Sequence, residues 1–303
     1  MIPVANMVDD QAAMAAAERA IPRLERQTFE SRALKSGVLT TLTWGAALVA
    51  AVPLFSVLYM LVVEGGSRID IEALSALPPA GFEQGGGFGN AIVGTLLMVG
   101  IASAIAVPLG IIAAIYLSIL GPATRVARVS RFLAKVLTGL PSILAGVFAY
   151  AAVVLWMGSY SALAGGIALG VLMLPTVVLT AEEAMKEVPQ RMKDAAFGMG
   201  CTRSQVIWSV VLPTGLPGIL TGVMLAVAGA AGESAPLLFT ALFSNYYVSE
   251  VIEPTASLSI LIYNFSAMPF DNQISLAWAA SLVLVFMVLI INILARLIGQ
   301  PKV

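Results

Sequence analysis

Six long apolar segments restrict the folds open to this chain more than any other feature. Each provides roughly the 20 residues that a helix needs to cross the apolar core of a bilayer. Glycines and prolines inside several of them are tolerated in membrane helices that pack among neighbours. The segments are 37–63, 90–120, 131–157, 162–180, 215–242 and 275–298. The sequence therefore predicts an all-α, polytopic membrane protein with six transmembrane helices.

The composition agrees with a membrane protein and excludes several classes of function. Of the 303 residues, 59% are hydrophobic and only 11% are charged, whereas soluble domains have about 25% charged residues. A net charge of −1 argues against nucleic acid as a partner. The chain has no histidine and a single cysteine, Cys201, which we interpret as a small residue beside a turn. We predict no catalytic residue, no metal site and no cofactor.

The basic residues are distributed unevenly between the two sides of the predicted membrane domain. Fifteen of the 16 fall in the segments that would share one side, and only Arg68 falls on the other. By the positive-inside rule, both termini are predicted to be cytoplasmic. The predicted organisation is a cytoplasmic tail (1–36), a six-span domain (37–298) with a cytoplasmic loop (181–213), and a short C-terminal end (299–303). Gly158 to Ser161 should form a tight turn between the third and fourth spans.

A polar island from Pro189 to Pro213 interrupts the apolar segments and predicts two short helices joined at a glycine. Gly200 stands where a helix C-cap favours a left-handed residue, and Thr202 with Gln205 has the spacing of a capping box. The first helix would present one apolar stripe at i, i+3, i+4 and i+7, formed by Met192, Ala195, Ala196 and Met199. This stripe is narrow and suits a shallow groove on another protein better than a core.

Glu233 is the one acidic residue well inside a predicted span. An intramembrane carboxylate is costly and usually faces a cavity or a partner, so we expect a functional role. The alternative is a glutamate at the outer interface, neutralised or paired with another subunit. Small neighbours on both sides would let another helix approach closely or leave a lumen open.

Other polar groups in the spans have two interpretations each. Pro141 and Ser142 could bend the third helix and expose backbone groups to a pathway, or mark a kink filled by neighbours. Asn90, Thr95 and Ser142 could contact a ligand or hydrogen-bond between helices. Two longer loops, 64–89 and 243–274, should lie on the outer side, and the second is apolar enough for a partial helix.

The island also resembles a known family. Asp194-Ala195-Ala196, Gly200 and Val210-x-Leu212-Pro213 are similar to the EAA–G–I-x-L-P loop of ABC importer permeases, with Asp for Glu and Val for Ile. The resemblance implies coupling helices that sit in a groove of a separate ATPase subunit. The chain has no Gly-rich phosphate loop followed by Lys-Ser or Lys-Thr, so it should not hydrolyse nucleotide itself.

Three further motifs resemble the A-type permeases of phosphate importers: Gly94-Thr95-Leu96, Gly139 to Ile143, and Gly232 to Leu238. This implies a bacterial inner-membrane protein that forms a heterodimer with a C-type permease. Two ATP-binding subunits and an extracytoplasmic phosphate-binding protein would complete the complex. Family members often carry an Arg four residues before the motif glutamate, where this chain has Gly229, so an Arg from the partner permease would have to contact phosphate.

The resulting hypothesis is a permease that forms half of a phosphate pathway and is driven by ATP hydrolysis in another subunit. The expected pathway residues are Glu233, Ser234, Ser142 and Thr95. The expected coupling residues are Met192, Asp194, Ala195, Ala196, Met199, Gly200, Leu212 and Pro213. Alternatives are a permease for sulfate, molybdate, phosphonate or another solute, an ATPase-independent channel or secondary transporter, and a membrane scaffold.

Overall fold

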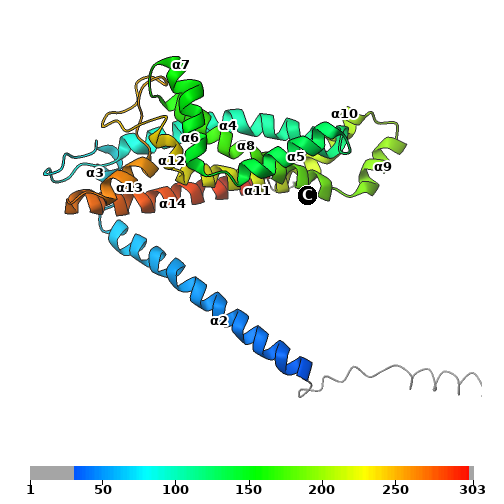
Figure 1. Cartoon of the computed structure of the whole chain (residues 1–303), viewed down its shortest axis with the longest axis horizontal. Coiled ribbons are helices and arrows are strands. Elements are labelled where there is room, and N and C mark those ends of the chain that lie inside the picture. Colours follow the sequence, from blue (N-terminus) through cyan, green and yellow to red (C-terminus); the bar gives the residue numbers. More distant parts are fainter. Residues whose placement is uncertain (1–30, 300–303) are drawn as a thin grey trace, which may run out of the picture. The chain divides into compact units, whose positions relative to one another are not determined.

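A computed structural model describes residues 31–299, and every regular element in that range is a helix (Figure 1). The chain divides into two units, 1–58 and 59–303, which are described separately. The predicted N-terminal tail lies almost wholly outside the described residues, as does most of the predicted C-terminal end. The predicted all-α class is confirmed.

The first unit contains most of helix α2 (Ser31–Met60), which continues as a π-helical turn, η1 (Leu61–Gly65). Together they contain a 32-residue apolar stretch, Leu34–Gly65, in which an 18-residue window has a mean hydropathy of 2.5. Within α2 the large apolar side chains are exposed, as at Val49. Such a helix is long enough to cross a bilayer and needs lipid or protein around it.

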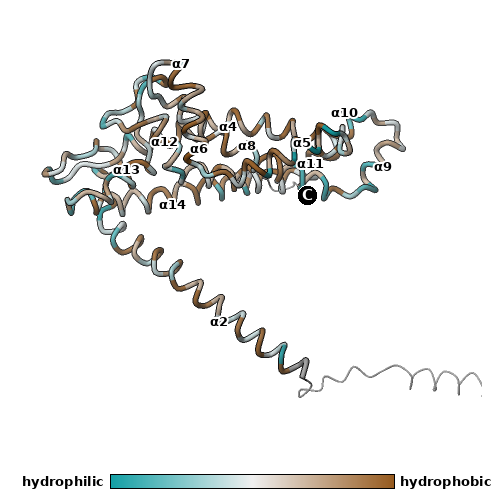
Figure 2. Tube along the Cα trace, viewed as in Figure 1, coloured by the Kyte–Doolittle hydropathy of each residue, from teal (hydrophilic) through white to brown (hydrophobic). Residues whose placement is uncertain are grey.

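Three more of the predicted spans lie within long apolar helices. These are α4 (Gly89–Ile115) with the π-turn η2 (Tyr116–Leu120), α8 (Ala162–Glu187), and α14 (Asp271–Gly299). Hydrophobic residues predominate along them in Figure 2. With Leu34–Gly65 and Arg203–Gly232, five helices are long and apolar enough to cross a membrane, or six spans if a bent pair is counted.

The third predicted span, 131–157, is a pair of helices with a sharp bend at Pro141, where the sequence predicted a bend or a kink. Helix α5 (Arg125–Thr138) is followed by α6 (Ser142–Ala149), the π-turn η3 (Tyr150–Val154) and α7 (Leu155–Met157). The two halves meet at 107°, and in Figure 1 α6 and α7 turn away from the direction of α4 and α8. Pro141 explains the break, because it lacks an N–H group and disfavours helical geometry in the residue before it.

The fifth span also differs from its predicted extent of 215–242. A continuous helix runs through α10 (Arg203–Val206), the π-turn η4 (Ile207–Val211) and α11 (Leu212–Gly232). It ends at Glu233, whose backbone is extended, and a short helix α12 (Ala235–Leu238) follows. Glu233 therefore lies at a helix end and not inside a helix.

Helix α8 lies at the centre of the second unit, where it packs against α4, α11, α5 and α6. Small residues allow these close contacts. A Cβ at Gly222 of α11 would overlap the Thr180 side chain of α8. The main core cluster consequently contains many alanines, together with larger side chains such as Met173 and Ile219.

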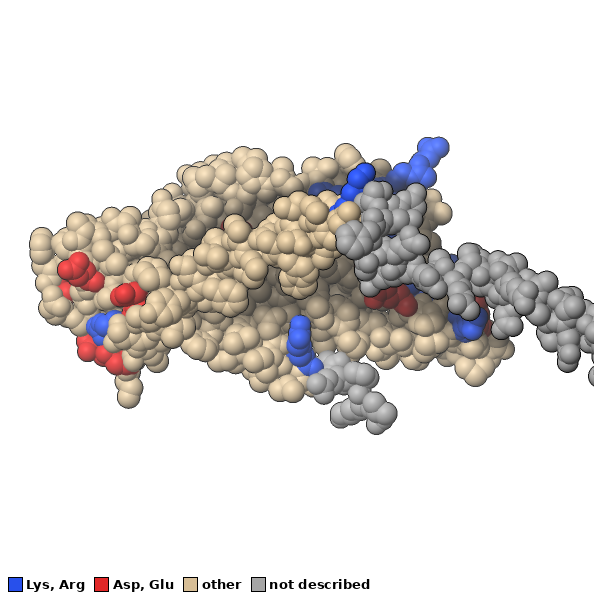
Figure 3. Space-filling view, turned by 90° about the horizontal axis from the view of Figure 1, so that it is seen from below, with Lys and Arg blue, Asp and Glu red and all other residues tan. Residues whose placement is uncertain are grey.

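A second core cluster lies at the end of this unit that holds α3 (Ile71–Ser75) and α13 (Leu258–Ser266). Helix α13 is the partial helix predicted between the fifth and sixth spans, and it packs on α14. Figure 3 shows acidic side chains gathered at this end. The acidic residues of the elements and loops here are Glu64, Asp70, Glu72, Glu83, Glu250, Glu253 and Asp271.

Candidate functional site

The break between α5 and α6 and the break between α11 and α12 meet at one partly open cavity of about 380 Å³. It lies about halfway along α8, where Met173 and Thr176 contribute to its wall, and the end of α5 and the start of α6 supply Thr138 and Ser142. Helix α11 and the residue after it complete the wall. The full lining is Leu137, Thr138, Leu140, Ser142, Leu172, Met173, Thr176, Leu225, Ala226, Gly229, Ala230 and Glu233.

Glu233 is half-buried at this cavity. Its backbone is held on both sides, because its N–H donates to the Ala230 carbonyl and its carbonyl accepts from Ser259 Oγ at 3.1 Å. Within residues 31–299 its carboxylate has no hydrogen-bond or ion-pair partner. The carboxylate is therefore free to accept a hydrogen bond from a ligand or to pair with a cation from another chain.

The remaining polar groups of the lining are hydroxyls and the start of a helix. Helix α6 begins at Pro141 and Ser142 without a side-chain cap, and a helix N-terminus carries partial positive charge. Among the described residues, no lysine or arginine lines the cavity. A Cβ built at Gly229 meets nothing within 4 Å, so this position has room for a side chain that the chain does not supply.

The other two predicted pathway residues do not line this cavity. Ser234 precedes α12 and is half-buried beside Glu233. Thr95 is buried, and its hydroxyl donates to the Ala91 carbonyl at 2.8 Å and accepts from the Leu258 N–H at 2.8 Å. Thr95 thus attaches α13 to α4, in line with the interhelical alternative.

The first of the two short helices predicted in the polar island is confirmed, and a second helix begins after Gly200 as predicted. Helix α9 (Gln190–Gly198) begins one residue after Pro189, and Gly200 has the positive φ of 84° expected of a residue that ends a helix. Both hydrogen bonds of the Thr202–Gln205 capping box are present. In Figure 2, hydrophilic residues are frequent at α9 and α10, between the two long helices.

The second of these helices does not end at Pro213 but continues into α11. Pro213 lacks the N–H for a regular helical bond and its ring would clash with the carbonyl of Ser209. The π-turn η4 lies directly before it and widens the helix there. Leu212 and Pro213 are therefore the first turn of α11 and not a loop.

The predicted apolar stripe of α9 is divided between two environments. Met199 is 79% exposed and Met192 44% exposed, whereas Ala196 is buried in the main core and anchors the helix. Phe197, which the stripe did not include, is 43% exposed. The exposed face also carries Ala195 and Asp194, whose carboxylate accepts from Gln190 Nε2 at 2.8 Å.

A buried ion cluster near the end of α8 was not identified from the sequence. Glu182 is 1% exposed, and its Oε1 accepts from Arg131 Nε at 2.6 Å and pairs with Lys186 Nζ at 2.9 Å. The sequence signal for this cluster was an acidic residue close to a long apolar segment. Glu182 is recognised as part of a helix only when the predicted fourth span, 162–180, is extended past residue 180.

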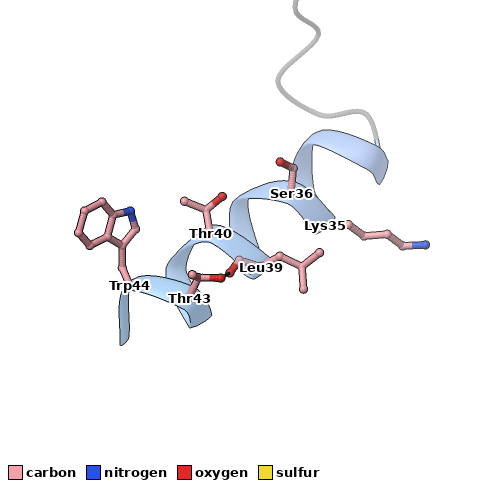
Figure 4. A pocket seen from close by; sticks show the side chains of 6 residues that line it. All are labelled: Lys35, Ser36, Leu39, Thr40, Thr43 and Trp44. Atoms are coloured by element: carbon pink, nitrogen blue, oxygen red, sulfur yellow. Dashed lines mark hydrogen bonds between the residues drawn. The ribbon is translucent and has the colours of Figure 1, made fainter. Parts of the chain in front are cut away.

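A separate hollow lies within the first unit, along the start of α2. Figure 4 shows that all its lining side chains come from that one helix, among them Lys35, Thr40 and Trp44. Because α2 alone supplies the lining among the described residues, the hollow is one side of a helix that carries both polar and apolar side chains. It offers no enclosed site for a small molecule.

The helices define a polytopic membrane protein, and solved structures of ABC transporters share its fold. A chain of a bacterial alginate ABC transporter matches with a TM-score of 0.62 at 14% identity, covering 91% of this chain and 100% of that one. A chain of a methionine ABC transporter matches with a TM-score of 0.52 at 18% identity, covering 70% and 92%.

Sequence comparisons define the family. Residues 106–301 match the family model described as binding-protein-dependent transport system inner membrane component. A phosphate transport system permease protein PstA of Yersinia pestis is 37% identical over 89% of this chain and 92% of its own length. A probable PstA of Methanocaldococcus jannaschii is 36% identical over 88% and 94%. The chain therefore belongs to the inner membrane components of binding-protein-dependent transport systems, and is a multi-pass membrane protein.

Proposed function

We propose that this chain is a permease subunit of an ATP-driven phosphate importer. The observation that carries the proposal is the cavity at which two broken helices meet, halfway along α8. Broken helices that line a cavity near the middle of the membrane are a common way to build a substrate site in transporters. The proposed substrate, phosphate, is taken from the relatives named as phosphate transport system permease proteins.

The residues of the cavity can supply the hydrogen-bonding groups of a phosphate site but not its positive charge. Hydroxyls and a helix N-terminus can donate hydrogen bonds to an anion, and the Glu233 carboxylate can accept one from protonated phosphate. Since the lining within the described residues has no cation, a second permease subunit across the open side would supply the positive charge. A C-type permease in a heterodimer would fill this role, and an external phosphate-binding protein would deliver the substrate.

The exposed face of α9 supports coupling to a separate ATP-binding subunit, present as a dimer. Two residues separate α8 from α9. The distance along α8 from its last residue, Glu187, to Thr176 at the cavity is about 17 Å at 1.5 Å per residue. The excess of basic residues near this loop supports a cytoplasmic position for it and for both termini. ATP hydrolysis would then occur outside this chain.

Glu233→Gln tests the cavity as the pathway. In the reconstituted complex we expect phosphate uptake to fall at least tenfold, because a neutral amide oxygen accepts a hydrogen bond from protonated phosphate more weakly than a carboxylate does. Competition by sulfate, which has no proton to donate, should increase in the variant. Glu250→Gln changes an exposed carboxylate outside the lining and should leave both readouts unchanged.

The same assay separates the alternatives. Unchanged uptake and selectivity in Glu233→Gln would remove Glu233 from the pathway. A parent complex that transports labelled sulfate, molybdate or phosphonate in preference to phosphate would reassign the substrate. Transport by the chain without any ATP-binding subunit would refute the importer and support a channel or secondary transporter.

A further inference from the structure

Helix α5 runs from the end of η2 to the cavity but has little apolar attachment of its own. Its buried side chains are Ala127 and Ala134, which are small. Its larger apolar residues are exposed: Val126, Val129, Phe132, Leu133, Val136 and Leu137. Since apolar stabilisation scales with buried area, two alanines hold α5 on the protein only weakly.

Arg131 lies between these two alanines on the same face of α5, at i+4 from one and i−3 from the other. Its guanidinium contacts three other parts of the chain. Nε donates to Glu182 of α8, Nη1 to the Pro122 carbonyl, and Nη2 to the Leu117 carbonyl at the end of α4 and η2. The last carbonyls of a helix lack partners within it, so the arginine caps this helix end as well.

Glu182 makes this contact specific. Its side chain is 2% exposed, while that of Arg131 is 24% exposed. A buried carboxylate tolerates loss of its partner poorly, because the remaining charge is left without compensation. Lys186 pairs with the same oxygen from one turn further along α8, but it lies on α8 itself and does not attach α5.

The contacts continue from Glu182 to α9. Lys193 of α9 donates to the Met185 carbonyl of α8 at 3.3 Å, and Ala196 is buried in the core cluster that contains Met185. At the other end of α5, Leu137 and Thr138 line the cavity. One run of contacts therefore joins α9, the end of α8, Arg131 and the cavity wall.

We propose that the Arg131–Glu182 ion pair makes α5 move together with α8, so that displacement of α9 changes the cavity wall at Thr138. This inference rests on the proposed function. Arg131 is a positioning residue here, since it touches neither the cavity nor the exposed face of α9. Such coupling requires an element with two discrete arrangements whose equilibrium both α9 and the cavity can shift.

The test uses a reporter of the cavity wall that does not depend on the substrate. Thr138→Cys is placed in a Cys201→Ser background of the full complex, and the rate of labelling by a maleimide is compared without nucleotide and in the vanadate-trapped state. We expect at least a threefold change between the states. Arg131→Met should reduce the change to less than 1.5-fold and lower uptake at least tenfold, with ATPase activity retained within twofold.

Arg128→Gln and Glu183→Gln are the matched controls, because both residues are exposed and neither joins α5 to α8. They should keep the labelling change. Glu182→Gln preserves the shape of the side chain and should give an intermediate loss of the labelling change. If Arg131→Met does not assemble, the result with Glu182→Gln decides the test.

A full labelling change in Arg131→Met or Glu182→Gln would overturn the proposal, as would failure of both to assemble, which would make the pair purely structural. A parent complex that does not transport phosphate would refute the proposed function alone, since the labelling change needs only nucleotide.

Discussion

Met199→Ala should weaken binding of the ATP-binding subunit by about one order of magnitude. Met199 is the most exposed apolar side chain of the α9 region, at 79%, and complete burial of a methionine contributes about 1.5–3 kcal/mol. Burying the exposed 79% on a partner would therefore contribute about 1.2–2.4 kcal/mol. At about 1.4 kcal/mol per tenfold change, this corresponds to about a 7- to 50-fold loss of affinity.

The assay is titration of the purified ATP-binding subunit onto the permease complex in nanodiscs, read as Kd. Because Met199 makes no buried contact, thermal stability of the permease should change by no more than about 0.5 kcal/mol. Met268→Ala is the control, an exposed methionine between α13 and α14. A Kd within twofold of the parent for both Met199→Ala and Met192→Ala would refute α9 as the docking surface.

Two further predictions concern stability and local order. Gly222→Ala should destabilise the complex by about 1–3 kcal/mol in thermal unfolding, because the added Cβ would overlap Thr180. Gly229→Ala on the same helix is the control and should be neutral or stabilising by up to about 1 kcal/mol, since its Cβ meets nothing within 4 Å. Equal losses of stability in the two variants would contradict the packing of α11 on α8. Thr202→Ala should cost about 0.5–2 kcal/mol through loss of the N-cap, seen as faster hydrogen exchange at residues 203–206, and Thr202→Ser should restore protection; unchanged exchange would show that the capping box does not hold α10.

The long apolar segments predicted the helices well, because a backbone in a bilayer must satisfy its hydrogen bonds within each helix. Four of the six predicted spans lie inside continuous helices, and the capping box at Thr202 was identified because its spacing is local. At Pro141 the sequence predicted a bend or kink but not its size, and at Glu233 it predicted no helix end. Hydropathy does not register a change in chain direction, and apolar character continues through both breaks, so neither the 107° angle nor the end of α11 was predicted.

The sequence by itself determined the class of protein, the number of apolar segments and the motifs that place the chain in its family, since these depend on composition and on spacing within one helix or turn. Only the tertiary structure decided which residues share a site. It brought Ser142 and Glu233 to one cavity, placed Thr95 in a contact between α4 and α13, and joined Arg131 to Glu182. Each of these depends on how helices distant in the chain pack against α8, and small residues such as Gly222 set that packing through contacts that no local pattern records.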